Sequence, residues 1–190
     1  MRRITALLCA ALIACLCFAC GERPGNTPES AYAPIIEAYR NLVRSEDIEV
    51  FMREAGVPEE FGRQADSSCF EILLGGKEDL AYAIYDINGD GVMELIVLSR
   101  AYYDVHALFT LRGDAPVLLG AYWSRGRCAI DTDGTVYYMG SGGAEDTVER
   151  AYVLPPNGMA LRMAGEGVSG IFPAGNPTRR LEMAIFPIAP

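Results

Sequence analysis

From Ser68 onward, the chain alternates short apolar segments with turns rich in glycine, aspartate and asparagine. In the segment 105–111, Val105, Ala107, Phe109 and Leu111 alternate with His106, Leu108 and Thr110, as in a half-buried strand. Strands are predicted over 69–74, 79–86, 93–100, 105–112, 116–123, 127–131, 135–140 and 147–154. Because turn signals recur between successive segments, the pattern favours an antiparallel meander.

The segment before these strands has the period of helices. One apolar stripe comprises Ile35, Ile36, Tyr39, Leu42 and Val43, and Pro34 is acceptable in a first turn. The residues Ser45 to Asp47 can cap a second short helix, which Gly56 would end. Helices followed by strands predict an α+β fold, in which an N-terminal helix pair packs on one face of the sheet.

The N-terminus has the proportions of a signal peptide. Arg2 and Arg3 precede an uncharged apolar stretch, residues 4–19, that is short for a membrane span. Two cysteines follow small residues there, as in bacterial lipoprotein signals, which both sites resemble. Cleavage before Cys20 exposes a polar sequence, whereas cleavage before Cys15 leaves an apolar one. Cys20 is therefore the predicted lipidated residue, with Cys15 as the alternative, and ordinary secretion or an uncleaved anchor stays open.

These features divide the chain into four parts. We expect a signal peptide over 1–19, a lipidated cysteine and flexible tether over 20–30, and an α+β domain over 31–164. The chain from Pro155 onward holds six of the eleven prolines, so 165–190 is expected to be irregular or partly disordered. The expected location is the extracytoplasmic face of a cell membrane, held by the lipid.

Charge and composition exclude some function classes. The chain has 25 acidic and 16 basic residues, a net charge of −9, and Lys77 is its only lysine. Nucleic acid is therefore not an expected partner, because phosphate binding needs clustered basic residues. The single histidine, His106, excludes metal sites that need two histidines. We expect a monomer.

One motif has the spacing of a metal-binding loop: Asp86-Ile87-Asn88-Gly89-Asp90-Gly91-Val92-Met93-Glu94. Its oxygen-bearing side chains stand at positions 1, 3, 5 and 9, with glycine at position 6. Ca²⁺ prefers six to eight oxygen ligands, and this spacing wraps several around one point. The predicted calcium ligands are the side chains of Asp86, Asn88, Asp90 and Glu94 and the carbonyl of Val92. The alternative is a tight hairpin without an ion, since Asn-Gly and Asp-Gly both favour such turns.

The motif resembles the calcium loop of FG-GAP repeats rather than a helix-loop-helix EF-hand. An EF-hand needs an acid at position 12, where this chain has Val97, and the flanking sequences are strand-like. The FG-GAP loop lies between two strands and takes its last carboxylate from position 9. More broadly, the order of lipobox, tether, helix and calcium-loop hairpin resembles uncharacterised Gram-positive bacterial lipoproteins. No activity comes with that resemblance.

Two cysteines remain outside the N-terminal segment, Cys69 and Cys128. In an oxidising compartment such a pair often forms a disulfide, and the long closed loop would stabilise the fold. The alternative is two buried free thiols. Their separation in the sequence does not decide between these states.

The sequence favours a non-enzymatic extracellular binding module with a calcium-stabilised hairpin. Aromatic side chains for a peptide or glycan ligand are available at Tyr102, Tyr103, Tyr122, Trp123, Tyr137, Tyr138 and Tyr152, although such residues also pack sheet faces. One alternative is a secreted carboxylate-based hydrolase, for example a carbohydrate-active enzyme. Another is a structural envelope protein without a bound ion. No catalytic residue is singled out.

Overall fold

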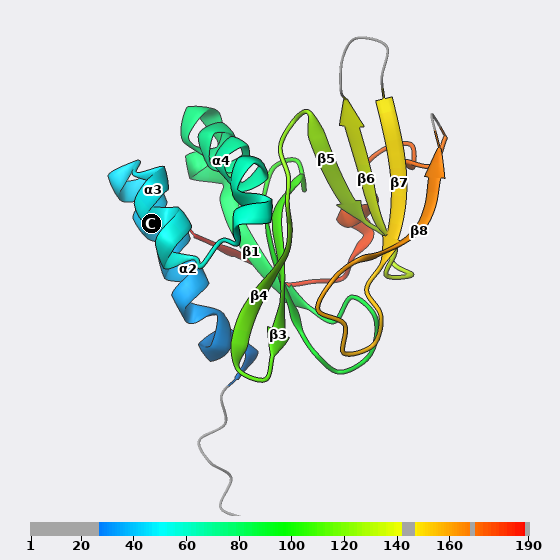
Figure 1. Ribbon diagram of the computed structural model, residues 1–190, viewed down its shortest axis with the longest axis horizontal. Helices are drawn as coiled ribbons and strands as arrows, with labels where there is room; N and C mark the ends of the chain where they lie inside the picture. The colour runs from blue at the N-terminus through cyan, green and yellow to red at the C-terminus, as the bar shows by residue number, and fades with distance from the viewer. Residues whose placement is uncertain (1–26, 142–146, 168–169, 189–190) are drawn as a thin grey trace, which may run out of the picture.

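The computed structural model describes residues 27–141, 147–167 and 170–188, arranged in three layers (Figure 1). Helices α2 (Pro28–Ser45), α3 (Ile48–Glu54) and α4 (Gly62–Glu71) lie on one side of a five-stranded antiparallel sheet, and a four-stranded antiparallel sheet lies on the other. The first sheet has the order β4 (Ala115–Ala121), β3 (Val105–Arg112), β2 (Glu94–Ser99), β1 (Leu80–Tyr85), β9 (Ile185–Pro187). The second has the order β5 (Gly126–Ile130), β6 (Val136–Ser141), β7 (Thr147–Val153), β8 (Arg162–Gly167). The α+β prediction is confirmed.

The first two helices begin at capping side chains. Thr27 Oγ1 accepts a hydrogen bond from the backbone N–H of Ser30 at 3.3 Å, ahead of α2. Asp47 Oδ1 accepts one from Val50 N–H at 2.9 Å and starts α3. Such caps satisfy amides that have no partner within the helix. Because α2 begins at Pro28, the last residues of the predicted tether belong to this helix instead.

The predicted strand 69–74 is wrong, because this segment is helical. It forms the end of α4 and a following π-helical turn, η2 (Ile72–Gly76). Ala65, Cys69 and Ile72 are buried at the spacing of one helix face. A short apolar run fits a strand or a buried helix equally well, and here the helical spacing with the preceding residues decides.

The strands form two sheets rather than the single meander that the sequence predicts. Strand β2 explains why, because all six of its residues are buried. Leu95 and Val97 pack into the core beneath the helices, whereas Ile96 and Leu98 pack into a second core between the sheets. With helices on one face only, the second set of apolar side chains would face water. The four-stranded sheet covers them.

The segment 165–190 is expected from the sequence to be irregular or partly disordered. It does contain little regular structure, but its described residues are packed against the domain. Strand β9 pairs with the edge of β1, and the N–H of Ile188 donates to the carbonyl of Leu80 at 2.9 Å. Thr178 is fully buried, and its Oγ1 accepts a hydrogen bond from Ile130 N–H at 3.0 Å. The core therefore extends beyond the predicted boundary at 164.

Candidate functional site

The loop between β1 and β2 is folded around the carboxylate of Asp86. Its Oδ1 accepts hydrogen bonds from the N–H groups of Gly89 at 2.8 Å and Asp90 at 3.2 Å, and Oδ2 accepts one from Gly91 at 2.9 Å. Gly89 and Gly91 have positive φ angles, 72° and 87°, which residues other than glycine rarely adopt. The spacing found in the sequence therefore closes a tight loop.

The next two polar residues join this loop to the connector between β7 and β8. Asn88 Nδ2 donates to the carbonyl oxygens of Leu154 at 3.2 Å and Pro155 at 3.3 Å. Asp90 Oδ2 accepts a hydrogen bond from Asn157 N–H at 2.6 Å. The loop thus links the first sheet to the second. We call the 86–91 loop with these contacts the inter-sheet junction.

The turn between β5 and β6 also reaches this junction. A Cβ atom at Gly134 would lie 2.4 Å from the carbonyl oxygen of Ile87, closer than any real contact. Gly134 also has a φ of 81°. Glycine is required here both for the backbone conformation and for the close approach of the two loops.

Glu94, the last acid of the motif, is fully buried at the base of the loop. Its Oε2 accepts a hydrogen bond from Ile87 N–H, and its Oε1 accepts one from the hydroxyl of Thr110, both at 3.0 Å. Burial, helped by the nearby charges of Asp90 and Asp86, raises the pKa of Glu94 to about 7, although the two hydrogen bonds act to lower it. A carboxyl in this position favours its neutral form.

The predicted calcium ligands therefore lie in one loop and at its base. Asp86, Asn88 and Asp90 hold the loop, and Val92 donates its N–H to Asp90 Oδ1 at 2.7 Å. Among the described residues, however, no group of three or more His, Cys, Asp or Glu side chains is arranged as a metal site. Calcium binding stays a prediction.

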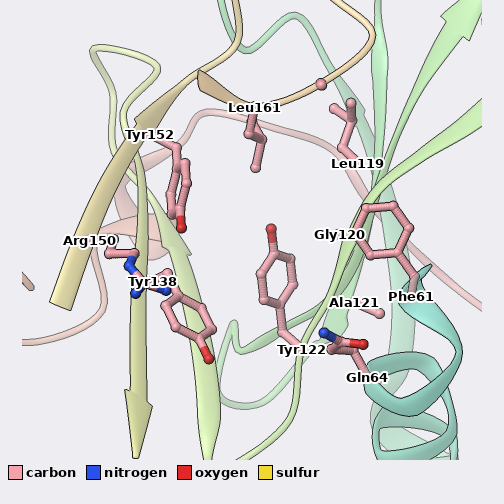
Figure 2. Close-up of a pocket in the computed structure, with 11 residues that line it drawn as sticks. Phe61, Gln64, Leu119, Gly120, Ala121, Tyr122, Tyr138, Arg150, Tyr152 and Leu161 are labelled. Atoms are coloured by element: carbon pink, nitrogen blue, oxygen red, sulfur yellow. The ribbon is translucent and has the colours of Figure 1, made fainter. Parts of the chain in front are cut away.

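A pocket of about 350 Å³ lies between the two sheets. Its walls come from the start of α4, from β4 and the residue after it, from β6 and β7, and from the β7–β8 connector (Figure 2). The lining residues are Phe61, Gln64, Leu119, Gly120, Ala121, Tyr122, Tyr138, Arg150, Tyr152, Ala160 and Leu161. Three of the tyrosines noted in the sequence thus meet at one site. We call it the inter-sheet pocket.

Tyr122 occupies the middle of the inter-sheet pocket, with Tyr138 and Tyr152 on one side (Figure 2). The rings of Tyr122 and Tyr138 are tilted, with centroids 6.4 Å apart. A Cβ atom at Gly120 would lie 2.3 Å from the hydroxyl of Tyr122, so a side chain at 120 would displace that ring. Burial raises the pKa of Tyr122 far above its ordinary value, which keeps the hydroxyl protonated.

A backbone irregularity shapes the same wall. In the pairing of β3 with β4, Leu108 pairs with Gly120 and Phe109 with Leu118, so Leu119 is the additional residue of a β-bulge. Bulges re-aim side chains and occur beside functional sites. Leu119 lines the pocket as a result.

Arg150 supplies a positive charge at the pocket. Its Nε donates to Glu166 Oε1 at 2.6 Å, in a pair that is partly exposed. Exposed pairs of this kind contribute little to stability. The guanidinium carries five N–H donors in total, so this one bond does not use its full capacity.

Comparison of the chain with protein families, curated proteins and solved structures found no match. The function of the site is therefore inferred from its own residues. The predicted lipidation sites, Cys20 and Cys15, lie outside the described residues. Within the described part, no helix is both long and apolar enough to cross a membrane.

The possible disulfide between Cys69 and Cys128 is not formed, and both cysteines are buried free thiols. Cys69 belongs to the core between helices and first sheet, whereas Cys128 belongs to the core between the two sheets. Separation into two cores on opposite faces of the first sheet explains why the pair is not bonded. Burial raises the pKa of both thiols, which disfavours the reactive thiolate.

Sequence reasoning missed most of the inter-sheet pocket. Phe61, Gln64, Arg150 and Leu161 come from distant segments, and no spacing pattern joins them. Gly120 was the available signal, because a glycine within a strand often marks the close approach of another group.

Proposed function

We propose that the protein is a lipid-anchored, extracytoplasmic binding module that holds a saccharide in the inter-sheet pocket. The observation that carries this proposal is the meeting of Tyr122, Tyr138 and Tyr152 with Arg150 in one cavity. Aromatic rings offer apolar faces, and tyrosine hydroxyls add hydrogen-bonding groups at the rim. Sugars present the complementary combination of apolar C–H faces and hydroxyl groups.

The size and polarity of the pocket support a small ligand. Its volume of about 350 Å³ lies within the roughly 300–1,000 Å³ typical of small-molecule sites. Gln64 and Arg150 add amide and guanidinium groups to a mainly apolar lining. A few polar groups on apolar walls are the usual composition of a site that orients its ligand.

The carboxylates favour binding over hydrolysis. Glycoside cleavage by paired carboxylates needs two acids that flank the scissile bond. The inter-sheet pocket is lined by no aspartate or glutamate among the described residues. Glu94, whose pKa is raised to about 7, is buried under the 86–91 loop instead of lining this pocket.

Replacing Tyr138 by alanine should weaken saccharide binding about ten-fold or more, because a ring that stacks on the ligand is lost. Tyr137 provides the matched control, since its ring packs on Phe172 at 6.4 Å and does not line the pocket. Isothermal titration of the full chain with N-acetylglucosamine and glucose oligomers measures both variants. The proposal would be contradicted if no oligomer bound, or if both variants bound equally weakly. Binding of peptides instead of saccharides would assign the pocket to a peptide ligand.

The same proposal includes a calcium ion at the inter-sheet junction. Asp86 and Asp90 lie close enough to Glu94 to raise its pKa, and no ion pair with Lys or Arg is found for these three among the described residues. Such acids repel one another when ionised, and a divalent cation relieves that repulsion. The residues that would hold it are Asp86, Asn88, Asp90, Val92 and Glu94.

Calcium should raise the melting temperature of the full chain. Loops in extracellular modules bind calcium with dissociation constants of about 0.1–1 mM. With a constant near 0.1 mM, roughly 2 mM calcium would stabilise the folded state by about 1.8 kcal/mol. For a chain of this size the expected rise is about 4–7 °C. Magnesium should have a smaller effect, because its octahedral shell fits such a loop poorly.

Two alanine variants locate this effect. Asp90→Ala should abolish the response to calcium, whereas Asp131→Ala should keep it. Asp131 lies in another Asp-rich turn and pairs with Arg180 at 2.9 Å. Differential scanning calorimetry in calcium and in chelator provides the measurement. Equal melting temperatures in the two buffers would reject the ion and leave the motif as a hydrogen-bonded turn.

A further inference from the structure

His106, the single histidine of the chain, lies at an irregularity of β3. In the pairing of β2 with β3, Val97 pairs with Ala107 and Leu98 with Val105, so His106 is the additional residue of a β-bulge. This bulge is separate from the one at Leu119 in β4. Bulges re-aim side chains and are frequent beside functional sites, so His106 is a candidate site residue.

The imidazole of His106 is buried without a complete set of hydrogen bonds. The residue is 6% exposed, and its Nδ1 is the one buried side-chain nitrogen or oxygen without a partner among the described residues. An unpaired buried polar atom costs about 1–3 kcal/mol. Burial lowers the pKa of the imidazole, so the ring is neutral at neutral pH and one nitrogen has a free lone pair.

Two adjoining cavities meet at this side chain. An inner cavity of about 90 Å³ and an outer groove of about 310 Å³ share three lining residues, Glu71, Asp104 and His106. Trp123 and Arg127 also line the inner cavity, beside β5. We call the two cavities together the His106 cleft. It shares no lining residue with the inter-sheet pocket.

The inner cavity has an excess of negative charge. Glu71 Oε2 accepts a hydrogen bond from Ser124 N–H at 2.7 Å, and Glu71 forms no ion pair with Lys or Arg among the described residues. Asp104 is paired with Arg127 at 3.3 Å. Two carboxylates therefore face one guanidinium, and a ligand that brings a positive charge is favoured over an anion.

The outer groove has an apolar rim. Leu74 and Tyr102 line it and are 73% and 65% exposed, which is unusual for large apolar side chains. Leu74 stands on the π-helical turn η2, followed by Gly75 and Gly76, which also line the groove. Turns of this type are frequent at functional sites. The cleft therefore combines an acidic inner end with an apolar outer end.

We propose that the His106 cleft binds a small primary amine with an apolar substituent. The ammonium group enters the inner cavity beside the imidazole of His106. The carboxylates of Glu71 and Asp104 balance its charge, and the apolar substituent lies against Leu74 and Tyr102. A cation is favoured because the two carboxylates outnumber the guanidinium of Arg127 and disfavour a ligand that carries negative charge. This site is independent of saccharide binding in the inter-sheet pocket.

The single histidine makes a direct test available. The full chain is labelled with ¹⁵N-histidine, so that its imidazole nitrogens give one pair of NMR signals. The probe is 2-phenylethylamine, and the control ligand is 2-phenylethanol, which has the same ring and chain but no ammonium group. Titration with the amine should shift the Nδ1 signal to saturation, whereas the alcohol should leave it in place.

Matched variants connect this shift to the cleft. Glu71→Gln keeps the acceptor for Ser124 but removes the charge, so the affinity for the amine should fall at least about ten-fold. Glu78→Gln is the control, because Glu78 is exposed nearby and does not line the cleft. The proposal is overturned if the amine leaves Nδ1 unshifted, if the alcohol shifts it equally, or if Glu71→Gln binds as tightly as the unaltered chain. A shift produced by zinc chloride and not by the amine would also overturn it, in favour of a metal site.

Discussion

Replacing Gly134 by alanine should destabilise the protein by about 2–4 kcal/mol, since two costs add. The first is the left-handed backbone conformation, with a φ of 81°. The second is steric, because the new Cβ would lie 2.4 Å from the carbonyl oxygen of Ile87. The β5–β6 turn would have to withdraw from the inter-sheet junction, which would loosen the contact between the sheets.

Gly113→Ala separates these two costs. Gly113 also has a positive φ, 63°, in the turn between β3 and β4, but a Cβ there would meet nothing within 4 Å. Its substitution should therefore cost only about 1–2 kcal/mol, the backbone share. Urea unfolding of both variants measures the difference. Equal destabilisation would show that the close approach to Ile87 contributes nothing.

In the absence of calcium, raising the pH should destabilise the protein through Glu94. Its pKa is raised from 4.5 to about 7 in the folded state, mainly by burial. The folded protein therefore holds this proton more tightly than the unfolded chain does. The resulting stabilisation is complete below pH 4.5 and is lost as the pH rises through 7. A shift of this size corresponds to about 3 kcal/mol.

Glu94→Gln should remove this pH dependence. Glutamine can accept the hydrogen bond from Ile87 and donate one to the hydroxyl of Thr110, but it carries no titrating proton. His106 contributes with the opposite sign, because its pKa is lowered and acid favours the unfolded chain below its ordinary value of 6.5. Both proteins share that contribution, so the difference between their urea-unfolding curves from pH 4.5 to 8 reports Glu94. Parallel pH profiles would contradict the role given to this carboxyl.

Elements that depend on nearby residues could be predicted from the sequence. The hairpin of β1 and β2 follows from two short apolar runs and from the Asn-Gly and Asp-Gly turn between them. The cap at Asp47 acts within three residues of its partner, whereas the cap at Thr27 lies in the segment predicted as tether. The helix over 69–74 could not be predicted in this way, because its short apolar run fits either structure and only the face shared with Ala65 decides.

Features that depend on distant residues could not be predicted. The division into two sheets follows from the second apolar face of β2. The apolar run of this strand indicates that both faces are buried, but it does not say which element covers each face. The 86–91 loop was found because its oxygen-bearing side chains recur at fixed spacing. The inter-sheet pocket was not found, since Phe61 and Tyr152 meet only after both sheets have packed.

Strand β9 also has a consequence for the order in which this protein can fold. The edge of β1 stays unpaired until residues 185–188, about 100 residues later in the sequence, are available, because β9 and Ile188 supply its partners. An unpaired edge of this kind is an aggregation hazard in a partly folded chain. For a protein exported through a membrane as proposed above, the first sheet would become complete only after residues 185–188 had crossed, so this edge would form on the extracytoplasmic side.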